Sequence, residues 1–434
     1  MGGTAPVPPP DAHLSGPPPH ETLAPSRTGR VGEGSPMAHR RSRGRLGTAG
    51  ALAAAAVVLA GGALPARAAG ATAHHTYIVT LQRGAAAESG HGRDLVERYG
   101  ATVRRTYSRA LNGFAVRADE AQARRLAADP GVASVTRDAE VSLRGTTAAT
   151  ATQPYPPSWG LDRIDQPAGA ALDGAYTAPA GGGKGTTIYV VDSGVRTGHR
   201  DFGGRARSGW DFVDDDPVAQ DGNGHGTHVA ATAAGTQYGV AKRADVVAVR
   251  VLDDRGEGTS AEVLAGLDWV LRHARKPSVV NLSLGSAIAG PVPEWDAAIR
   301  AGVRAGLTFT VAAGNAGRSA GSFSPGRVPQ AITVGATDRA DRRAPFSNWG
   351  PAVDLFAPGD RIVSASPTSD TAAATLSGTS MAAPHVAGAA ALYLAAHRSA
   401  TPARVSTALA AESTKGAVRN AGRGSPNRLL HTGG

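Results

Sequence analysis

The sequence predicts an α/β protein in which a parallel central sheet carries helices on both faces, preceded by a small α+β domain. Helical stretches alternate with apolar runs. One of the helical stretches begins at the capping box Thr259-Ser260-Ala261-Glu262. Another begins at Thr401-Pro402, where proline takes the first helical position. Such alternation is typical of βαβ units and therefore of a parallel sheet. The apolar runs, each suited to a fully buried strand, are at residues 186–191, 246–251, 279–282, 308–312 and 331–334.

The segment 75–143 has a different order of elements and is predicted to form the small domain. Its expected elements follow one another as βαββαβ, which is the split, ferredoxin-like arrangement. The strands are at 76–81, 103–107, 113–116 and 132–138, and the helices are at 93–99 and 120–128. The stretch 145–150 is small and polar without an apolar pattern, so we expect an exposed linker that is open to proteolysis.

The first 68 residues are expected to belong to neither domain. Residues 1–36 are proline-rich without periodicity, which indicates a disordered or untranslated extension. From Met37 a basic segment, an Ala/Val/Leu-rich run and the site Ala66-Arg67-Ala68 follow in the order of a secretory signal peptide. A retained membrane anchor is the alternative, but this run is short and weakly hydrophobic. We therefore expect a signal peptide at 37–68, a segment 69–150 that contains the small domain and the linker, and the main domain at 151–434. The protein is expected to be secreted and extracellular, without a stable membrane anchor.

Composition narrows the classes of partner. The net charge of +10 could indicate nucleic acid or an anionic membrane. From Ala151 onward, however, 27 basic residues face 24 acidic ones, so most of the excess lies in the first 150 residues. No basic and aromatic cluster resembles an RNA-binding motif, and we expect no nucleic-acid partner. The absence of cysteine excludes disulfides, a thiolate metal site and a cysteine nucleophile.

Two polar residues follow buried strands and are candidates for a catalytic site. Attack on a peptide bond by a hydroxyl needs a base, a carboxylate to orient that base, and donors for the oxyanion. Asp192 follows the run 188–191, at the strand end that lines the ligand crevice in parallel α/β proteins. Asn315 follows the strand at 308–312 and offers a neutral N–H. Each residue by itself is also compatible with an ordinary turn.

Two further segments place polar residues at the start of helices. In Gly224-His225-Gly226-Thr227-His228 the glycines would let a substrate backbone approach His225 closely. A zinc site is the alternative, although the Glu and the spacing of an H-E-x-x-H helix are missing, and His228 is expected to be structural. Ser380 in Gly378-Thr379-Ser380-Met381 begins a helix whose dipole favours negative charge at its oxygen. A plain N-cap serine is the alternative there.

The segments that contain Asp192, His225, Asn315 and Ser380 follow one another along the chain in that order. Together they resemble the subtilisin family of serine peptidases (peptidase S8), and its proteinase K branch most closely. Segment 75–143 resembles the inhibitory propeptide of the I9 type, notably at Tyr77-Ile78-Val79 and Leu111-Asn112-Gly113-Phe114. The resemblance extends over almost all of residues 155–430 through Arg250-Val251-Leu252-Asp253-Asp254, Asn281-Leu282-Ser283-Leu284-Gly285 and Phe346-Ser347-Asn348-Trp349-Gly350.

This resemblance implies a secreted serine endopeptidase of the subtilisin type (EC 3.4.21), made as a self-cleaving zymogen and acting through an acyl-enzyme. Ser380 would be the nucleophile, His225 the general base and acid, and Asp192 the carboxylate that holds the imidazole, while Asn315 and the Ser380 N–H would stabilise the oxyanion. The order Asp, His, Ser of this triad is itself part of the resemblance. Two edge segments would bind the substrate as an added strand, and a third would form a wall of the pocket for a large apolar or aromatic residue before the cleaved bond. These segments are Gly256, Glu257 and Gly258; Ser283, Leu284 and Gly285; and Ala312, Ala313 and Gly314.

The resemblance also sets expectations for cofactors and partners. Catalysis would need no cofactor, but a structural calcium ion would be held by the carboxylate of Asp354 and the carbonyls of Pro329 and Ala331. The partners would be protein and peptide substrates and the chain's own propeptide, the intramolecular inhibitor that occupies 69–150. We expect a monomer and self-cleavage between about Arg144 and Ala151, with Ala151 as the mature start. Ala231 and Ser286 replace glycines that are usual in the family.

Three other functions fit the sequence less well. A binding protein that had lost activity would be expected to lack at least one of the four residues. An esterase of the α/β-hydrolase class would need G-x-S-x-G and the order Ser, acid, His. A nucleotide site could use the glycines at 181–185, but they precede the strand that a phosphate loop should follow.

Overall fold

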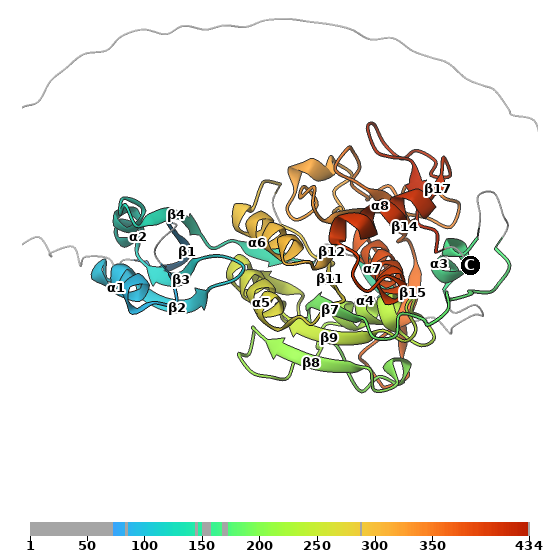
Figure 1. Cartoon of the computed structure of the whole chain (residues 1–434), viewed down its shortest axis with the longest axis horizontal. Coiled ribbons are helices and arrows are strands. Elements are labelled where there is room, and N and C mark those ends of the chain that lie inside the picture. Colours follow the sequence, from blue (N-terminus) through green and yellow to red (C-terminus); the bar gives the residue numbers. More distant parts are fainter. Residues whose placement is uncertain are drawn as a thin grey trace, which may run out of the picture. The chain divides into compact units, whose positions relative to one another are not determined.

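The computed structural model describes residues 73–82, 86–143, 146–149, 158–166, 172–286 and 289–432 (Figure 1). The predicted signal peptide at 37–68 and the extension before it lie outside these ranges, so both stay predictions. Among the helices of the described ranges, none is both long and apolar enough to cross a membrane.

The small domain has the predicted order of elements. Its four strands form an antiparallel sheet in the order β2-β3-β1-β4, and a capping box between Asp119 and Gln122 starts its second helix. The prediction of a ferredoxin-like arrangement is thereby confirmed. The elements are β1 (His75–Leu81), α1 (Gly90–Arg98), β2 (Thr102–Tyr107), β3 (Gly113–Ala118), α2 (Glu120–Ala127) and β4 (Val132–Arg137).

The small sheet buries side chains on both of its faces. Val79 and Phe114 pack in a cluster with residues of α1 and α2. Ile78, Tyr107 and Ala115 point the other way and belong to the buried cluster that contains the helices α5 (Ser260–His273) and α6 (Pro293–Arg304) of the main domain. Because strand residues alternate between faces, one apolar run serves both contacts.

The main domain is built on a nine-stranded sheet in the order β17-β18-β14-β13-β12-β11-β7-β9-β8. All neighbours in it are parallel except the antiparallel pair β17 and β18. The predicted parallel sheet is therefore confirmed. The strands are β7 (Thr187–Asp192), β8 (Ala206–Asp211), β9 (Asp245–Arg250), β11 (Ser278–Leu282), β12 (Thr308–Ala312), β13 (Ile332–Thr337), β14 (Leu355–Pro358), β17 (Thr414–Lys415) and β18 (Arg428–Leu429).

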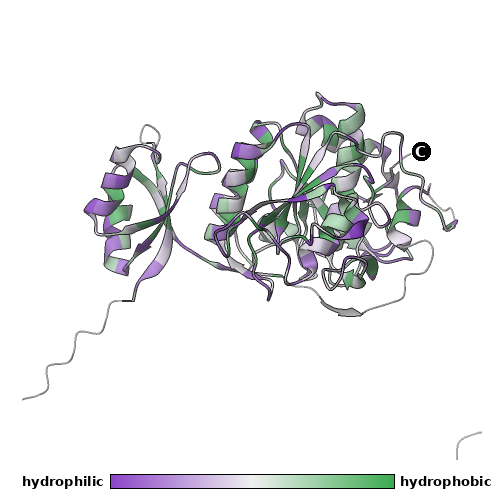
Figure 2. Cartoon of the chain, turned by 90° about the horizontal axis from the view of Figure 1, so that it is seen from below, coloured by the Kyte–Doolittle hydropathy of each residue, from purple (hydrophilic) through white to green (hydrophobic). Residues whose placement is uncertain are grey.

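Helices cover both faces of this sheet, as expected. α4 (His225–Ala234) and α7 (Thr379–Ala396) pack on one face, and α5 and α6 pack on the other (Figure 1). In β7, Ile188 and Val190 join the first cluster while Tyr189 and Val191 join the second. Figure 2 shows hydrophobic residues along the central strands and polar ones on the outer sides of the helices. α3 (Trp159–Ile164) and α8 (Pro402–Glu412) complete the described helices, with the short 3₁₀ turns η1 (Arg200–Phe202) and η2 (Ala320–Ser322).

In the described residues, five short strands belong neither to the four-stranded sheet of the small domain nor to the nine-stranded sheet of the main domain. They are β5 (Glu140–Ser142), β6 (Thr146–Ala149), β10 (Glu257–Thr259), β15 (Ile362–Ala365) and β16 (Ala373–Ser377). The stretch 145–150 was expected to be an exposed linker open to proteolysis, and the structure shows that residues 146–149 pair antiparallel with β16. Backbone pairing at a free strand edge needs no apolar pattern, which explains why the sequence did not indicate it.

Candidate active site

The last residue of β7 and the first residue of α4 form a buried pair. The Nδ1 atom of His225 lies 2.7 Å from Oδ1 of Asp192, and the Asp192 side chain has no exposed surface. Burial lowers the pKa of His225, but the neighbouring Asp192 carboxylate outweighs this effect, so the pKa is raised overall above 6.5. The imidazole is thereby held with Nδ1 towards Asp192.

Two residues without a predicted role hold this pair in place. The buried carboxylate of Asp221 accepts hydrogen bonds from the backbone of Asn223, Gly224 and Thr227, which shapes the loop into α4. Asp221 also accepts a hydrogen bond from Ser193 Oγ at 2.9 Å, and Ser193 Oγ in turn accepts the N–H of Gly226 at 3.0 Å. Asp221 and Ser193 lie close in sequence to His225 and Asp192, but only the tertiary contact between the two segments shows what they do.

Ser380 lies in the first turn of α7, at the positive end of an 18-residue helix. Its hydroxyl donates to the carbonyl of Ser283 at 2.9 Å, and the hydroxyl of Ser283 donates back to the carbonyl of Ser380 at 2.8 Å. The hydroxyl therefore points to the Ser283 segment in this state and not to His225. Catalytic hydrogen bonds are often long or unformed before substrate binds.

The side chain of Asn315 is oriented by its neighbour in α7. Its amide oxygen accepts hydrogen bonds from both the backbone N–H and the hydroxyl of Thr379, each at 2.8 Å. A Cβ atom placed on Gly378 would lie 3.3 Å from Nδ2 of Asn315 and 3.6 Å from the backbone nitrogen of Ser380. Both N–H groups thus lie around the same small space, which glycine leaves open.

The predicted substrate segments enclose a strand of the chain itself. β5 pairs antiparallel with β10, so that Ser142 lies opposite Glu257 and Val141 opposite Gly258. On its other side Val141 forms a bridge with Ser286. The N–H of Leu143 donates to the carbonyl of Gly256 at 2.9 Å. β5 therefore lies between the two edge segments as an added strand.

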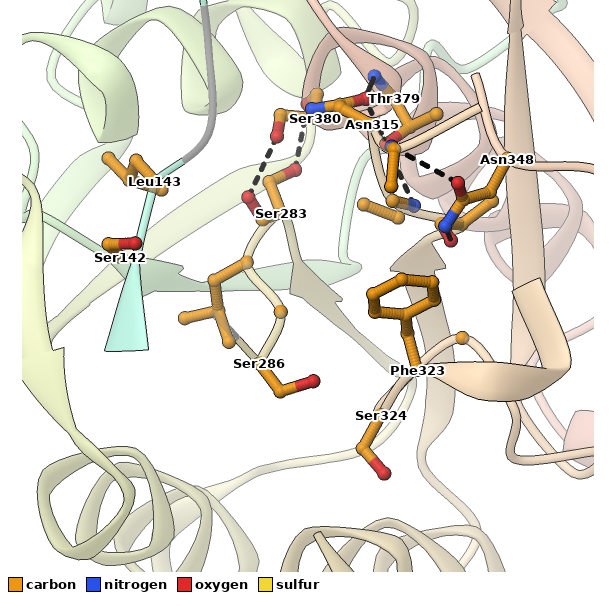
Figure 3. Close-up of a pocket in the computed structure, with 17 residues that line it drawn as sticks. Ser142, Leu143, Ser283, Ser286, Asn315, Phe323, Ser324, Asn348, Thr379 and Ser380 are labelled. Atoms are coloured by element: carbon orange, nitrogen blue, oxygen red, sulfur yellow. Dashed lines mark hydrogen bonds between the residues drawn. The ribbon is translucent and has the colours of Figure 1, made fainter. Parts of the chain in front are cut away.

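A pocket opens beside Ser380 (Figure 3). Its labelled residues place Ser142 and Leu143 at one side, Phe323 and Ser324 at another, and Ser380 with Asn315 at a third. Phe323 and Asn348 were not predicted to take part. Asn348 donates to the carbonyl of Ala313 at 2.8 Å and so supports the wall. The predicted residues that line the pocket are Ser283, Leu284, Gly285, Ala312, Ala313, Gly314, Asn315 and Ser380.

The two histidines of α4 do not converge on one site. Nε2 of His228 lies 2.9 Å from the carbonyl oxygen of Ile362, whereas His225 faces Asp192. In the part of the chain that the structure describes, no three His, Cys, Asp or Glu side chains are grouped as ligands for a metal ion. The alternative of a zinc site is not supported, while His228 is structural as expected.

Comparison with known proteins agrees with this geometry. A family model described as "Subtilase family" matches residues 183–430. The chain belongs to the subtilase family. A second model, "Peptidase inhibitor I9", matches residues 76–144 of this subtilase. It is a serine proteinase that carries its own I9-type propeptide domain.

Relatives and a solved structure extend the comparison. The subtilase is 50% identical over 333 residues to an "Extracellular serine proteinase" of Thermus sp. (strain Rt41A), with 77% of this chain and 78% of the relative covered. It is 45% identical over 334 residues to "Alkaline serine exoprotease A" of Vibrio alginolyticus, with 77% of this chain and 61% of the relative covered. The crystal structure of a cold adapted subtilisin-like serine proteinase matches with a TM-score of 0.61 at 48% identity, covering 63% of this chain and 97% of that chain.

Proposed function

We propose that this subtilase is a secreted endopeptidase of broad specificity that cleaves its own propeptide and acts through an acyl-enzyme. The observation that carries the proposal is β5. Backbone groups of a chain segment pair with β10 and Ser286 beside Ser380, which is the arrangement that a peptide substrate would need. Recognition through backbone hydrogen bonds tolerates many side chains and supports broad specificity.

The mechanism assigns one role to each of the four predicted residues. After rotation from the Ser283 carbonyl, Ser380 Oγ attacks the carbonyl carbon of the scissile bond while Nε2 of His225 takes its proton. Asp192 holds Nδ1–H and stabilises the imidazolium that forms. The oxyanion is bound by the Ser380 N–H and Nδ2 of Asn315, the two groups that surround the space at Gly378.

The remaining steps return the enzyme to its starting state. Collapse of the tetrahedral intermediate breaks the C–N bond, and the imidazolium gives its proton to the leaving amine. Water then attacks the acyl-enzyme with His225 again as base. The acid product leaves, and Ser380 regains its proton.

The first cleavage is proposed within the chain itself. Leu143 is bound to Gly256, and beyond the site Thr146 and Ala149 pair with Ser377 and Thr375 of β16. Arg144 and Gly145, between Leu143 and Thr146, lie outside the described residues, as do Thr150 and Ala151 at the end of the predicted range from Arg144 to Ala151. Since both flanks are held in place, we expect the first cut between Leu143 and Thr146, and a start at Ala151 would then require a second cut.

The pocket supports a preference for large apolar residues before the cleaved bond. Its walls carry the small side chains of Ala312 and Ala313, and Phe323 contributes an aromatic surface. Among the described residues that line it, none has a charged side chain. A carboxylate entering this pocket would lose hydration without gaining a partner, which is unfavourable.

A structural calcium ion is proposed at Asp354. Its Oδ2 accepts the N–H of Thr333 at 2.8 Å, and burial raises the pKa of the carboxyl to about 6. Burial disfavours the charged form of this carboxyl group, and a bound cation would balance that charge. Asp354 therefore suits a calcium ion, which prefers oxygen ligands. The carbonyls of Pro329 and Ala331 would complete the protein's share of ligands, and the ion would supply stability and no catalytic step.

The mechanism is tested with a phosphonylating reagent directed at activated serines. We expect labelling of Ser380 alone, with parallel loss of casein hydrolysis. The variant Ser369→Ala, which removes an exposed serine that is not among the pocket-lining residues, serves as control and should label normally. Labelling without any casein hydrolysis in the unlabelled enzyme would favour an esterase or a decayed enzyme instead.

A further inference from the structure

Arg105 of the propeptide domain binds the main domain away from the active-site residues. β2 has a bulge against β3, because Val103 lies opposite Val116 and Arg105 lies opposite Ala115, which leaves Arg104 as the additional residue. A bulge re-aims the side chains that follow it. The Arg105 guanidinium donates to the carbonyl of Phe212 at 2.9 Å and lies 3.3 Å from the carboxylate of Asp215.

Phe212 also contacts this guanidinium through its ring. The central carbon of the Arg105 guanidinium lies 5.4 Å from the centroid of the Phe212 ring. One guanidinium thus meets a carboxylate, a carbonyl and an aromatic face at once. This combination suits the planar, multiply donating guanidinium better than the compact ammonium of lysine.

The loop that binds Arg105 is held by the main domain's own contacts. Asp211 and Asp216 exchange backbone hydrogen bonds of 2.8 and 3.2 Å, which close the loop around Phe212 and Asp215. The buried guanidinium of Arg250 binds the carboxylates of Asp211 and Asp214, each at 2.6 Å. None of these contacts involves the propeptide domain, so the site is preorganised and should persist after the propeptide has left.

The charge of the loop favours a cationic partner. Residues 211–216 carry four aspartates, and Arg250 is the buried cation that faces two of them. Asp215 has a largely exposed side chain, and its backbone φ of 61° holds the chain in the left-handed region that aspartate tolerates. Its carboxylate therefore projects from a tight turn towards the position that Arg105 takes.

We propose that Phe212 and Asp215 form a guanidinium-binding exosite, which in the zymogen and after self-cleavage holds the propeptide domain through Arg105. This inference rests on the proposed function, because it makes release of the cut propeptide depend on a charge contact outside the catalytic cleft. Salt screens such a partly exposed contact, so release should become faster as ionic strength rises.

The test uses the full chain with Ser380→Ala, which keeps the propeptide attached. Three backbone N–H groups, those of Ser108, Arg109 and Ala110, bind the Asp268 carboxylate of α5, so they are protected from hydrogen exchange only while the domains are docked. In this background Arg105→Met should accelerate their exchange about five- to tenfold at low salt, the combined effect of a surface ion pair and a cation–π contact.

Matched variants separate the exosite from general damage. Arg104→Met removes the neighbouring arginine of β2 and should leave the exchange rates unchanged. Asp215→Asn leaves the propeptide unaltered and the Phe212 contacts in place, so it should accelerate exchange but by less than Arg105→Met. The double variant should be no faster than Arg105→Met alone, and high salt should reduce the difference between Arg105→Met and the parent chain. Equal rates for Arg105→Met and Arg104→Met, or additive effects of Arg105→Met and Asp215→Asn, would overturn the proposal. Since the chain is inactive throughout, failure of the proposed peptidase function would not change this outcome.

Discussion

The Oδ1 atom of Asp268 in α5 accepts the backbone N–H groups of both Arg109 and Ala110 in the propeptide domain, at 2.6 and 2.7 Å. The Asp268 side chain is only 2% exposed, and its other oxygen is bound by Arg272 at 2.9 Å. One carboxylate of the peptidase domain therefore orders the β2–β3 turn of the inhibitor, while β5 occupies the cleft. The inhibitor is therefore held at the β2–β3 turn and at β5, in addition to the contact of Arg105 with Phe212 and Asp215.

Replacing Asp268 should weaken this attachment. Asp268→Ala leaves the backbone donors of the turn without their charged acceptor, and such hydrogen bonds contribute about 1.5–3 kcal/mol each when a charged group is involved. We expect the variant to show peptidase activity earlier after folding than wild type, with unchanged kcat once the propeptide is gone. An unchanged delay would mean that the hydrogen bonds to Asp268 do not contribute to inhibition.

Asp192→Asn should reduce kcat about 10⁴-fold with little change in KM, because the amide cannot stabilise the imidazolium at His225. Asp192 is also the cause of the raised pKa of His225. Wild-type kcat/KM should therefore decrease as the pH falls through the pKa of His225, which lies above 6.5, because the imidazole then gains a proton. This acid limb of the pH–rate profile should move to lower pH in the variant. A limb that stays in place would assign the titration to another group.

Asn315→Leu should lower kcat by about 10²–10³ with KM nearly unchanged, the usual cost of removing one oxyanion donor. Thr379 acts as a positioning residue, since its hydroxyl donates to Asn315 at 2.8 Å. Thr379→Val should give a smaller loss of kcat, and Thr379→Ser should restore most of it. If the serine variant were as impaired as the valine variant, the hydroxyl would not be the group that matters.

Acid should destabilise the fold through its buried histidines. His385 in α7 is fully buried, and burial lowers its pKa to about 4. Since the unfolded chain takes up the proton at about 6.5, stability is lost as pH falls from about 6.5 to 4, by about 3 kcal/mol at 1.36 kcal/mol per pKa unit. Denaturant unfolding of His385→Leu between pH 7 and 4 should show a shallower loss than wild type. His397→Gln, which removes an exposed histidine, should behave as wild type.

Calcium removal should lower the melting temperature at pH 8, and Asp354→Asn should make the chelator effect smaller. Because the pKa of Asp354 is raised to about 6 without the ion, calcium protection should fade as pH drops through that value and protons compete for the carboxylate. A chelator effect of the same size in Asp354→Asn would place the ion elsewhere.

The sequence predicted the segments of the site better than their contacts. The strand ends at Asp192 and Asn315 and the helix starts at His225 and Ser380 follow from apolar patterns and from the family resemblance. The bond between Ser380 and Ser283, the support from Asp221, and the contact of Arg105 with Phe212 join residues far apart in the chain. Local sequence patterns carry no information about contacts between distant residues. For the same reason, the pairing of residues 146–149 with β16 was not predicted.

Intact mass and N-terminal mapping of separately expressed wild type and Ser380→Ala test self-processing by Ser380 most directly. Wild type should be cut between Leu143 and Thr146, and pure Ser380→Ala should keep that bond intact. Cleavage of the Ser380→Ala chain at the same place and the same rate, with no other peptidase present, would contradict self-processing by Ser380.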